Sequence, residues 1–434
     1  MPSKLIIYPT DKLSKNDDII FFNNLIKQNI NKNILNDFNY KIVKPYGLDP
    51  LSIKNDPGKL AKVYDKFIKI LSIQLNKLHS ENKNERYWSI ILGVWLRDLI
   101  RTTYNRYNSI QEAFNKNDIN SILTIDDRKH NSTSEEIKDF MSYTNDLLFD
   151  AILITKILDL TKYKNKINKI IPSESKSFIK YNPKKYNKKI SLKKNLKNLF
   201  KLFRFFKKED DAFIISSGLP FIQEIMLQIN LKQFPQYWEI PKVEYLSFQK
   251  FLRDKIDLNN KAENEFEMIL AKLIPHYLPL SVVENYKQIL LFCEKLPWPK
   301  RPKFVFTSDS FGASGVFQFW LADKVDKGFS YFVGQHGLGY LELIEKKDHI
   351  EFKTSDKFFA WGNSKFDKKI VPLFNTKVVG KKEIQNHGDK LVVVTRSSGV
   401  RVIHYDRLEY GSLLNKQTLF LLENLDEKIK KKTI

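Results

Sequence analysis

A chain of 434 residues with 42% hydrophobic and 13% aromatic residues is long enough for two or three globular domains and too apolar to be disordered. A lone cysteine, Cys293, excludes an internal disulfide framework and favours a reducing compartment. The net charge of +23 is concentrated in residues 161–208, which hold 17 Lys or Arg and one acid. This distribution argues against a general nucleic-acid-binding surface and for one local basic feature.

The N-terminal residues predict a strand and no export signal. The apolar run Lys4–Tyr8 is followed at once by polar residues, whereas a signal peptide needs a longer apolar region. No stretch reaches the roughly 18 uninterrupted apolar residues of a membrane span. We therefore expect a soluble, cytoplasmic protein. Residues 19–30 form an amphipathic stretch, and Tyr40–Val43 resembles a second strand.

Residues 60–160 are predicted to be mainly helical, because Leu71, Leu75 and Leu78 recur at helical spacing. A second stripe of this kind contains Trp88, Leu92, Trp95, Leu96 and Ile100. We interpret the surrounding run, Arg86–Asp98, as core packing with polar edges in preference to a ligand site.

The basic segment has two halves. The part before about residue 190 is polar, contains Pro172 and Pro183, and indicates a linker. Residues 191–208 place Leu and Phe side chains on one helical stripe with lysines elsewhere. Two interpretations stay open for 191–208: a basic amphipathic helix lying on an anionic membrane, or a helix that packs on the core.

From Ala212 onward, apolar strands alternate with helices, a pattern that indicates a parallel, doubly wound sheet. The expected helices are 222–229 and 316–325. The expected strands are 212–215, 303–306, 329–333, 357–361 and 391–394.

Three loops follow these strands, and ligands of such sheets collect at the carboxyl ends of the strands. Small residues there let a substrate approach the backbone, and a following helix offers unpaired N–H groups to a phosphate. The candidate ligand-binding residues are Ser217, Gly218, Ser308, Ser310, Gln335, Gly337 and Gly339, with His336 and Asp309 as candidate catalytic residues.

His336 is the strongest candidate, because glycines on both sides leave its imidazole accessible. Such a histidine can act as a general base or, when protonated, stabilise a diphosphate leaving group. Asp309 is either its partner carboxylate or the N-cap of the following helix. We expect no metal or cofactor, since there is no His-Glu-x-x-His, Walker A, Asp-x-Asp or complete dinucleotide-binding pattern.

An ordered series of motifs gives the chain a family resemblance. The series is Arg86–Leu96, Thr307–Asp309, Phe319–Ala322, Gly328, Gln335–Gly337 and Ser355–Gly362. It resembles the O-antigen (surface carbohydrate) transferase family, which is distantly similar to capsule polysaccharide and CDP-glycerol-type transferases. The resemblance covers about residues 6–362.

The resemblance implies a GT-B-like architecture, with two Rossmann-like halves facing a cleft that His336 would line and a C-terminal half holding a nucleotide-sugar donor. Leu338 departs from the family, where a second glycine often follows His-Gly. The C-terminal half should begin near Lys390 with a strand, 391–395, and a donor-binding loop containing Arg396, Ser397 and Ser398. Only about 40 residues follow, so this half is expected to be incomplete.

The expected organisation is an α/β and helical region (1–160), a basic linker with an amphipathic helix (161–210), a Rossmann-like region (211–375) and the start of a second half (376–434). The expected function is sugar transfer from a nucleotide-activated donor to a bacterial surface glycan or lipid-linked acceptor, at the inner face of the membrane. Alternatives are a non-catalytic scaffold of a glycan-assembly complex and a CDP-polyol phosphotransferase. No nucleic-acid partner is expected.

Overall fold

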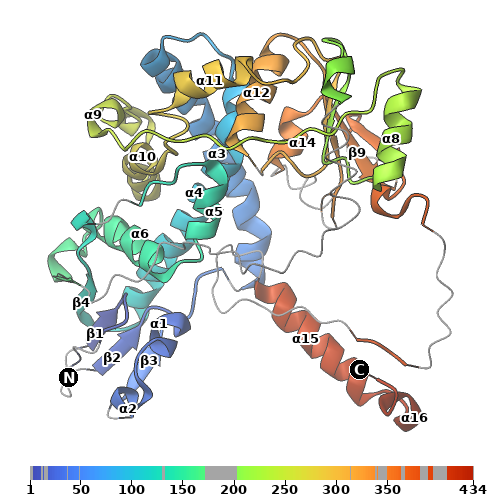
Figure 1. Cartoon of the computed structure of the whole chain (residues 1–434). Coiled ribbons are helices and arrows are strands. Elements are labelled where there is room, and N and C mark those ends of the chain that lie inside the picture. The colour runs from blue at the N-terminus through green and yellow to red at the C-terminus, as the bar shows by residue number, and fades with distance from the viewer. Residues whose placement is uncertain are drawn as a thin grey trace.

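Two five-stranded sheets, each with parallel strands only, form the framework of the chain (Figure 1). The computed structural model describes residues 3–10, 13, 18–36, 38–47, 49–129, 132–171, 203–312, 314–337, 340, 349–362, 367–381, 390–393 and 408–433. The predicted α/β class is therefore confirmed, and the two parallel sheets are consistent with a Rossmann-like fold.

The first sheet has the strand order β3-β2-β1-β4-β5. Its strands are β1 (Ser3–Ile6), β2 (Asp18–Phe21), β3 (Tyr40–Ile42), β4 (Ile119–Ile125) and β5 (Ile167–Ile170). Leu5 on the central strand pairs with Ile20 on one side and Ile122 on the other, and all three side chains are buried. The order reverses between β1 and β4, as it does in a doubly wound half.

The described helices of this half lie between β2 and β3, between β3 and β4, or between β4 and β5. They are α1 (Asn24–Gln28), α2 (Lys32–Leu35), α3 (Pro50–His79), α4 (Glu85–Lys116), α5 (Ile137–Tyr143) and α6 (Leu147–Asp159), with short 3-10 turns at Asp127–Lys129 and Lys164–Lys166. Asp49 caps α3 by accepting a hydrogen bond from the Ser52 N–H at 2.9 Å, and Asn84 caps α4 in the same way. These caps satisfy N–H groups that the first helical turn leaves without partners.

Sequence predictions for this half are confirmed for β1, β3 and the two helical stripes, which lie on α3 and α4. The region 60–160 is mainly helical, as predicted. The sequence did not predict β2, which begins the amphipathic stretch 19–30, or β4, which lies within the mainly helical region. Strand β5 lies beyond residue 160, in the expected linker. Short apolar runs do not distinguish a strand from a helix, and pairing in the sheet decides between them.

The second sheet has the order β10-β9-β8-β7-β6, so its strands lie side by side in chain order. They are β6 (Phe213–Ile215), β7 (Val305–Thr307), β8 (Tyr331–Gly334), β9 (Lys357–Trp361) and β10 (Ile370–Leu373). The four strands predicted between 212 and 361 are confirmed. The doubly wound order expected here is wrong, because no reversal occurs among these five strands.

Helices α8 to α14 connect these strands. The described elements are α8 (Phe221–Asn230), α9 (Lys250–Arg253), α10 (Glu265–Tyr277), α11 (Tyr286–Glu294), α12 (Gly315–Asp326) and α14 (Ile350–Thr354), with 3-10 turns η3 (Phe203–Phe206), η4 (Asn259–Lys261) and η5 (Thr376–Val378). The two helices predicted from periodicity correspond to α8 and α12. Among the helices that the structure describes, none combines the length and apolar character needed to cross a membrane.

The C-terminal region differs from our expectation. In the described part of the predicted strand 391–395, Leu391 makes only an isolated bridge to Thr433. Helices α15 (Leu408–Glu423) and α16 (Glu427–Lys430) follow. The second sheet lies within the region 211–375 that we expected to be Rossmann-like. The prediction that a further half begins near Lys390 stays a prediction, because residues 382–389 and 394–407 lie outside the described part of the chain.

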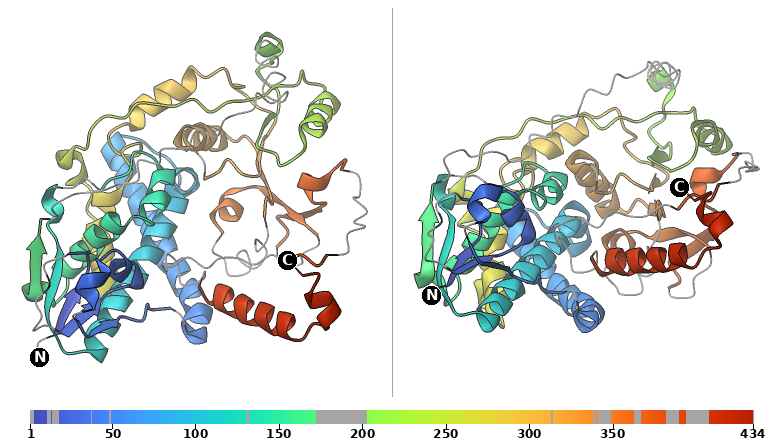
Figure 2. Two further views of the ribbon diagram at one scale, coloured as in Figure 1. Left: turned by 60° about the horizontal axis from the view of Figure 1, so that its bottom comes forward. Right: turned by 90° about the horizontal axis from the view of Figure 1, so that it is seen from below.

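Helices α3 and α4 lie between the two sheets in all three views (Figures 1 and 2). Helix α4 packs on α5 and α6 of the first half and on α12 and α14 of the second. Arg86, at its start, makes an ion pair of 2.7 Å with Asp356 and donates to the Thr354 carbonyl. The two halves therefore share α4 as a common core element.

Candidate functional site

The three loops singled out from the sequence follow neighbouring strands and are joined by hydrogen bonds. Ser308, after β7, donates its N–H to the Ser216 carbonyl at 3.0 Å and its hydroxyl to the Ser217 carbonyl at 2.8 Å. The Ser310 and Ser216 hydroxyls are 2.8 Å apart. Because parallel strands end at the same edge of a sheet, these loops form one continuous polar edge.

Asp309 faces the other neighbouring loop. Its Oδ1 lies 3.5 Å from His336 Nε2, and the Asp309 and His336 side chains are 71% and 33% exposed. The N-cap of α12 is Ser314, so Asp309 does not have the capping role that the sequence left open. Residues 308 to 310 thus point alternately, with both serines toward the β6 loop and the carboxylate toward the imidazole.

Gly334 is the last residue of β8 and brings the His336 turn close to the β7 loop. A Cβ atom at this position would lie 2.4 Å from Ser308 Oγ and 2.9 Å from the Phe306 ring. Any larger side chain would therefore push the two loops apart.

Gln335 is buried and holds the His336 turn in place. Its backbone N–H donates to the Phe359 carbonyl, its amide oxygen accepts from the Trp361 N–H at 2.7 Å, and its amide nitrogen donates to the Gly337 carbonyl at 2.6 Å. These contacts orient the turn, and the predicted role of Gln335 in substrate binding stays a prediction.

A buried polar cluster lies behind His336. The Tyr340 hydroxyl hydrogen-bonds the His336 ring, and the Tyr340 ring packs on His349 with centroids 4.5 Å apart. His349 Nε2 is 3.8 Å from Glu351 Oε2. Among the charged groups that act on Glu351 and His349 is Arg97, which reaches this region from α4.

Burial dominates the electrostatics of this cluster. It raises the pKa of Glu351 to about 7, although the Arg97 charge and a hydrogen bond with Tyr340 act in the opposite direction. It lowers the pKa of His349 to about 3, and the positive charges of Arg97 and His336 add to the effect. A carboxyl group that titrates near neutral pH close to a candidate base is a feature of functional sites.

Sequence reasoning missed the residues of this cluster. Arg97 lies in the run that we interpreted as core packing, directly after the family-like motif that ends at Leu96, and no local pattern marks it. Glu351 and His349 lie in a polar stretch where no local pattern distinguishes them. Their relation to His336 comes from Tyr340, whose ring packs on His349 and whose hydroxyl hydrogen-bonds the His336 ring.

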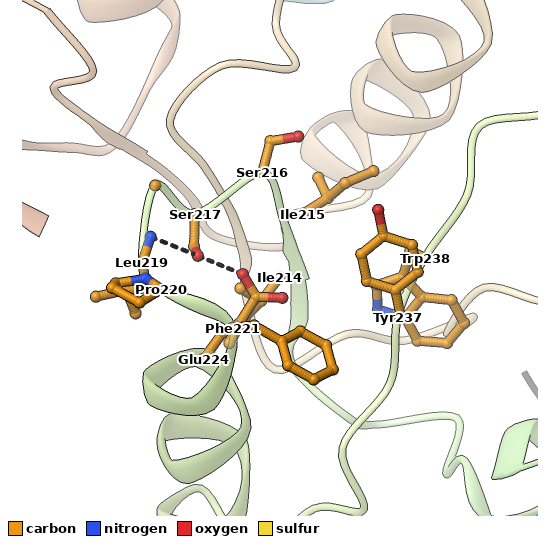
Figure 3. A pocket seen from close by; sticks show the side chains of 11 residues that line it. Ile214, Ile215, Ser216, Ser217, Leu219, Pro220, Phe221, Glu224, Tyr237 and Trp238 are labelled. Atoms are coloured by element: carbon orange, nitrogen blue, oxygen red, sulfur yellow. Dashed lines mark hydrogen bonds between the residues drawn. The ribbon is translucent and has the colours of Figure 1, made fainter. Parts of the chain in front are cut away.

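A pocket of about 320 Å³ lies beside the β6 loop (Figure 3). Ser217, Leu219 and Pro220 lie on one side, and Tyr237 and Trp238 on the other. The Ser217 hydroxyl donates to Glu224 on α8 and accepts from the Leu219 N–H. The pocket thus combines an aromatic wall with a polar loop.

The shape of the β6 loop depends on left-handed backbone. Ser216 has a φ of 49° and Gly218 a φ of 78°. A Cβ atom on Gly218 would also lie 2.9 Å from Thr376 Oγ1. Glycine is therefore required at 218 for both conformation and space.

Several predicted residues lie outside the described part of the chain: Gly339, Arg396, Ser397, Ser398 and residues 191–202 of the basic helix. Their proposed roles stay predictions. Among the described residues, no group of three or more His, Cys, Asp and Glu side chains is suited to a metal ion.

These features describe an α/β protein with Rossmann-like sheets, a polar strand edge able to receive a ligand, and a carboxylate–imidazole pair able to move a proton. A model of the LIC12162 family transferase matches residues 5–434. The chain belongs to this family and is a transferase, which confirms the predicted resemblance at that level. Comparisons with curated proteins and with solved structures give no match.

Proposed function

We propose that this transferase moves a sugar from a nucleotide-activated donor to a bacterial surface glycan, such as an O-antigen or capsule chain. The observation that carries the proposal is the Asp309–His336 pair, 3.5 Å apart, at the polar edge of a parallel sheet. In this reaction an acceptor hydroxyl attacks the anomeric carbon, and the bond from that carbon to the diphosphate oxygen breaks. His336 takes the hydroxyl proton, and Asp309 stabilises the imidazolium.

The pocket of Figure 3 is the proposed place for the donor nucleotide. Its volume of about 320 Å³ is at the lower end of the range for small-molecule sites, which matches part of a nucleotide sugar. The Tyr237 and Trp238 rings offer an apolar face for a planar base. Ser308 and Ser310 connect this pocket to the loop that carries Asp309. Under this proposal the nucleotide and the catalytic pair lie on either side of the β7 loop.

The test is nucleoside diphosphate release from a panel of nucleotide sugars incubated with the purified chain and a surface-glycan acceptor fraction. We expect His336→Ala to lower turnover by about 10²–10⁴-fold and Asp309→Asn to lower it less, with nucleotide-sugar binding retained. Asp254→Asn, which removes only a surface ion pair with Lys250, is the matched control and should keep full activity. Near-normal turnover in His336→Ala would contradict the role of His336.

The same panel separates the alternatives. Saturable donor binding without turnover by the wild-type chain would favour a scaffold of a glycan-assembly complex. Turnover of CDP-polyols in place of nucleotide sugars would favour polyol phosphotransfer. A lipid-linked acceptor would place the reaction at the inner face of the cell membrane.

A further inference from the structure

Helix α8 turns its apolar stripe away from the protein. Ile222, Met226 and Ile229 recur at helical spacing, and their side chains are 67%, 52% and 56% exposed. A surface helix of a globular protein normally turns such a stripe toward the core. In Figure 1, α8 lies at the margin of the molecule.

The buried side chain of α8 is polar, and its hydrogen-bonding groups are satisfied. Gln228 is buried, and its amide exchanges two hydrogen bonds with the backbone of Gln236, at 2.8 and 3.0 Å. Gln233, just after the helix, exchanges two more with the backbone of Ala212 at the start of β6. Rotating α8 to bury its apolar stripe would leave these buried amides without partners, which is costly. The buried hydrogen bonds of Gln228 and Gln233 therefore fix the outward direction of the apolar stripe.

Aromatic side chains from two other segments extend this surface. Phe206 of η3 stacks on Phe234 with ring centroids 5.1 Å apart, and Phe205 is 92% exposed. We call the whole surface the α8 face: Phe205, Phe206, Ile222, Met226, Ile229 and Phe234. Exposed apolar surface of this kind marks an interaction site.

Lysines border the α8 face. Lys208 follows Phe206 by two residues and Lys232 follows the end of α8, and both are exposed. Lys207 is ion-paired with Glu209 at 2.9 Å and adds no free charge. Glu224, the acid of α8, is turned toward Ser217 in the pocket. Two copies of this face would bring their lysines together and repel, whereas a negatively charged lipid surface would attract them.

We propose that the α8 face docks the protein on an anionic lipid bilayer, with its apolar side chains at the level of the acyl boundary and its lysines among the headgroups. Phe221 and Glu224 on the opposite side of α8 line the pocket of Figure 3, so docking through the α8 face leaves that pocket uncovered. This inference goes beyond the proposed function and does not depend on it.

The test is cosedimentation of the full chain with vesicles of phosphatidylglycerol and phosphatidylcholine in equal parts, and with pure phosphatidylcholine vesicles. We expect the wild type to bind the anionic vesicles, and less strongly as salt rises from roughly 0.1 M to roughly 1 M, which shortens the Debye length from about 10 Å to about 3 Å. Ile222→Ser, Met226→Ser and Ile229→Ser together should weaken binding by about tenfold or more. Lys208→Glu with Lys232→Glu should weaken it at low salt.

The matched control replaces three apolar residues of similar exposure on other helices: Ile73→Ser, Met268→Ser and Leu291→Ser. This variant should bind as the wild type does, and circular dichroism of each variant verifies folding. Equal binding by the α8 and control variants would overturn the proposal and assign any binding to the basic segment before η3. A wild-type dimer that the α8 substitutions dissociate, or equal binding to neutral vesicles by every variant, would overturn it too.

Discussion

His336 lies between an exposed partner, Asp309, and a buried one, Tyr340. Its glycine-rich setting is visible in the sequence, because glycines at both sides of a histidine are a local pattern. The buried partners are not visible in this way. Glu351 is 15 residues further along the chain, and it joins the cluster through His349, on which the Tyr340 ring packs. The candidate base was therefore predictable, and the groups that control its surroundings were not.

Glu351 makes a specific contribution to the pH dependence of stability. Its pKa rises from an ordinary 4.5 to about 7 in the folded state. Between these pH values the folded chain holds a proton that the unfolded chain releases, so the free energy of unfolding falls as pH rises, by at most about 3 kcal/mol. We expect the free energy of unfolding of the Glu351→Gln variant not to show this decrease with rising pH. Urea unfolding at a series of pH values between about 4.5 and 7 measures the difference.

His349 acts with the opposite sign. Its pKa falls from 6.5 to about 3, so the unfolded chain binds a proton that the folded chain does not, and this contribution stabilises the fold as pH rises through that window. Removing the Glu351 carboxylate should thus leave a steeper rise of stability with pH than the wild type shows. Parallel curves for the two proteins would contradict a raised pKa at Glu351.

Helix α4 has one feature that the sequence pattern predicts and another that only its packing reveals. Its apolar stripe was predicted, yet the helix also buries charges. Arg106 and Asp150 of α6 form an ion pair of 2.7 Å, and both side chains are almost completely buried. A charged side chain on a helix can be buried in a protein when another element supplies an oppositely charged partner. Here α6 supplies Asp150 for Arg106 of α4.

Asp150→Ala should therefore lower the free energy of unfolding by about 3–5 kcal/mol, because it removes the carboxylate from a buried guanidinium. Replacing both residues, Arg106→Met with Asp150→Leu, should be less harmful. Glu112→Ala, which breaks a solvent-exposed pair with Lys116 on α4, is the control and should change stability by less than about 0.5 kcal/mol. Denaturant unfolding measures all three. An equal loss in the single and double variants would show that packing dominates over charge.

For helix α8, the sequence predicted the position of the helix but not the direction of its apolar side chains. Its position and apolar period were predicted from Ile222, Ile225, Met226 and Ile229, and the helix forms there. Its direction was not predicted, because a stripe in the sequence says which residues share a face but not where that face points. The buried amide of Gln228 decides the direction.

At the scale of the whole molecule, α4 joins the two sheets into one structure. Gly93 is the point of closest approach, where a Cβ atom would lie 2.6 Å from Tyr64 Oη on α3 and 2.8 Å from Ile350 Cγ2 on α14. Arg86 adds the ion pair with Asp356. Separation of the halves would expose the core on both sides of α4.

Gly93→Ala should therefore lower the melting temperature of the whole chain, through overpacking worth about 1–3 kcal/mol. Differential scanning calorimetry should show one transition that shifts as a unit. Gly58→Ala on α3, where a Cβ atom meets nothing within 4 Å, is the control and should be neutral or slightly stabilising. Two transitions, of which only one moves, would contradict a shared core.

The sequence by itself determined the α/β class, the strands β6 to β9, the periodic helices and the His336 turn, because each of these depends on local periodicity or on a short run of glycines. Tertiary structure decided the strand orders, the place of β2, β4 and β5, the outward stripe of α8 and the partners of His336. These features depend on contacts between residues far apart in the chain. Local pattern carries no information about them, and only packing selects among the arrangements that the pattern allows.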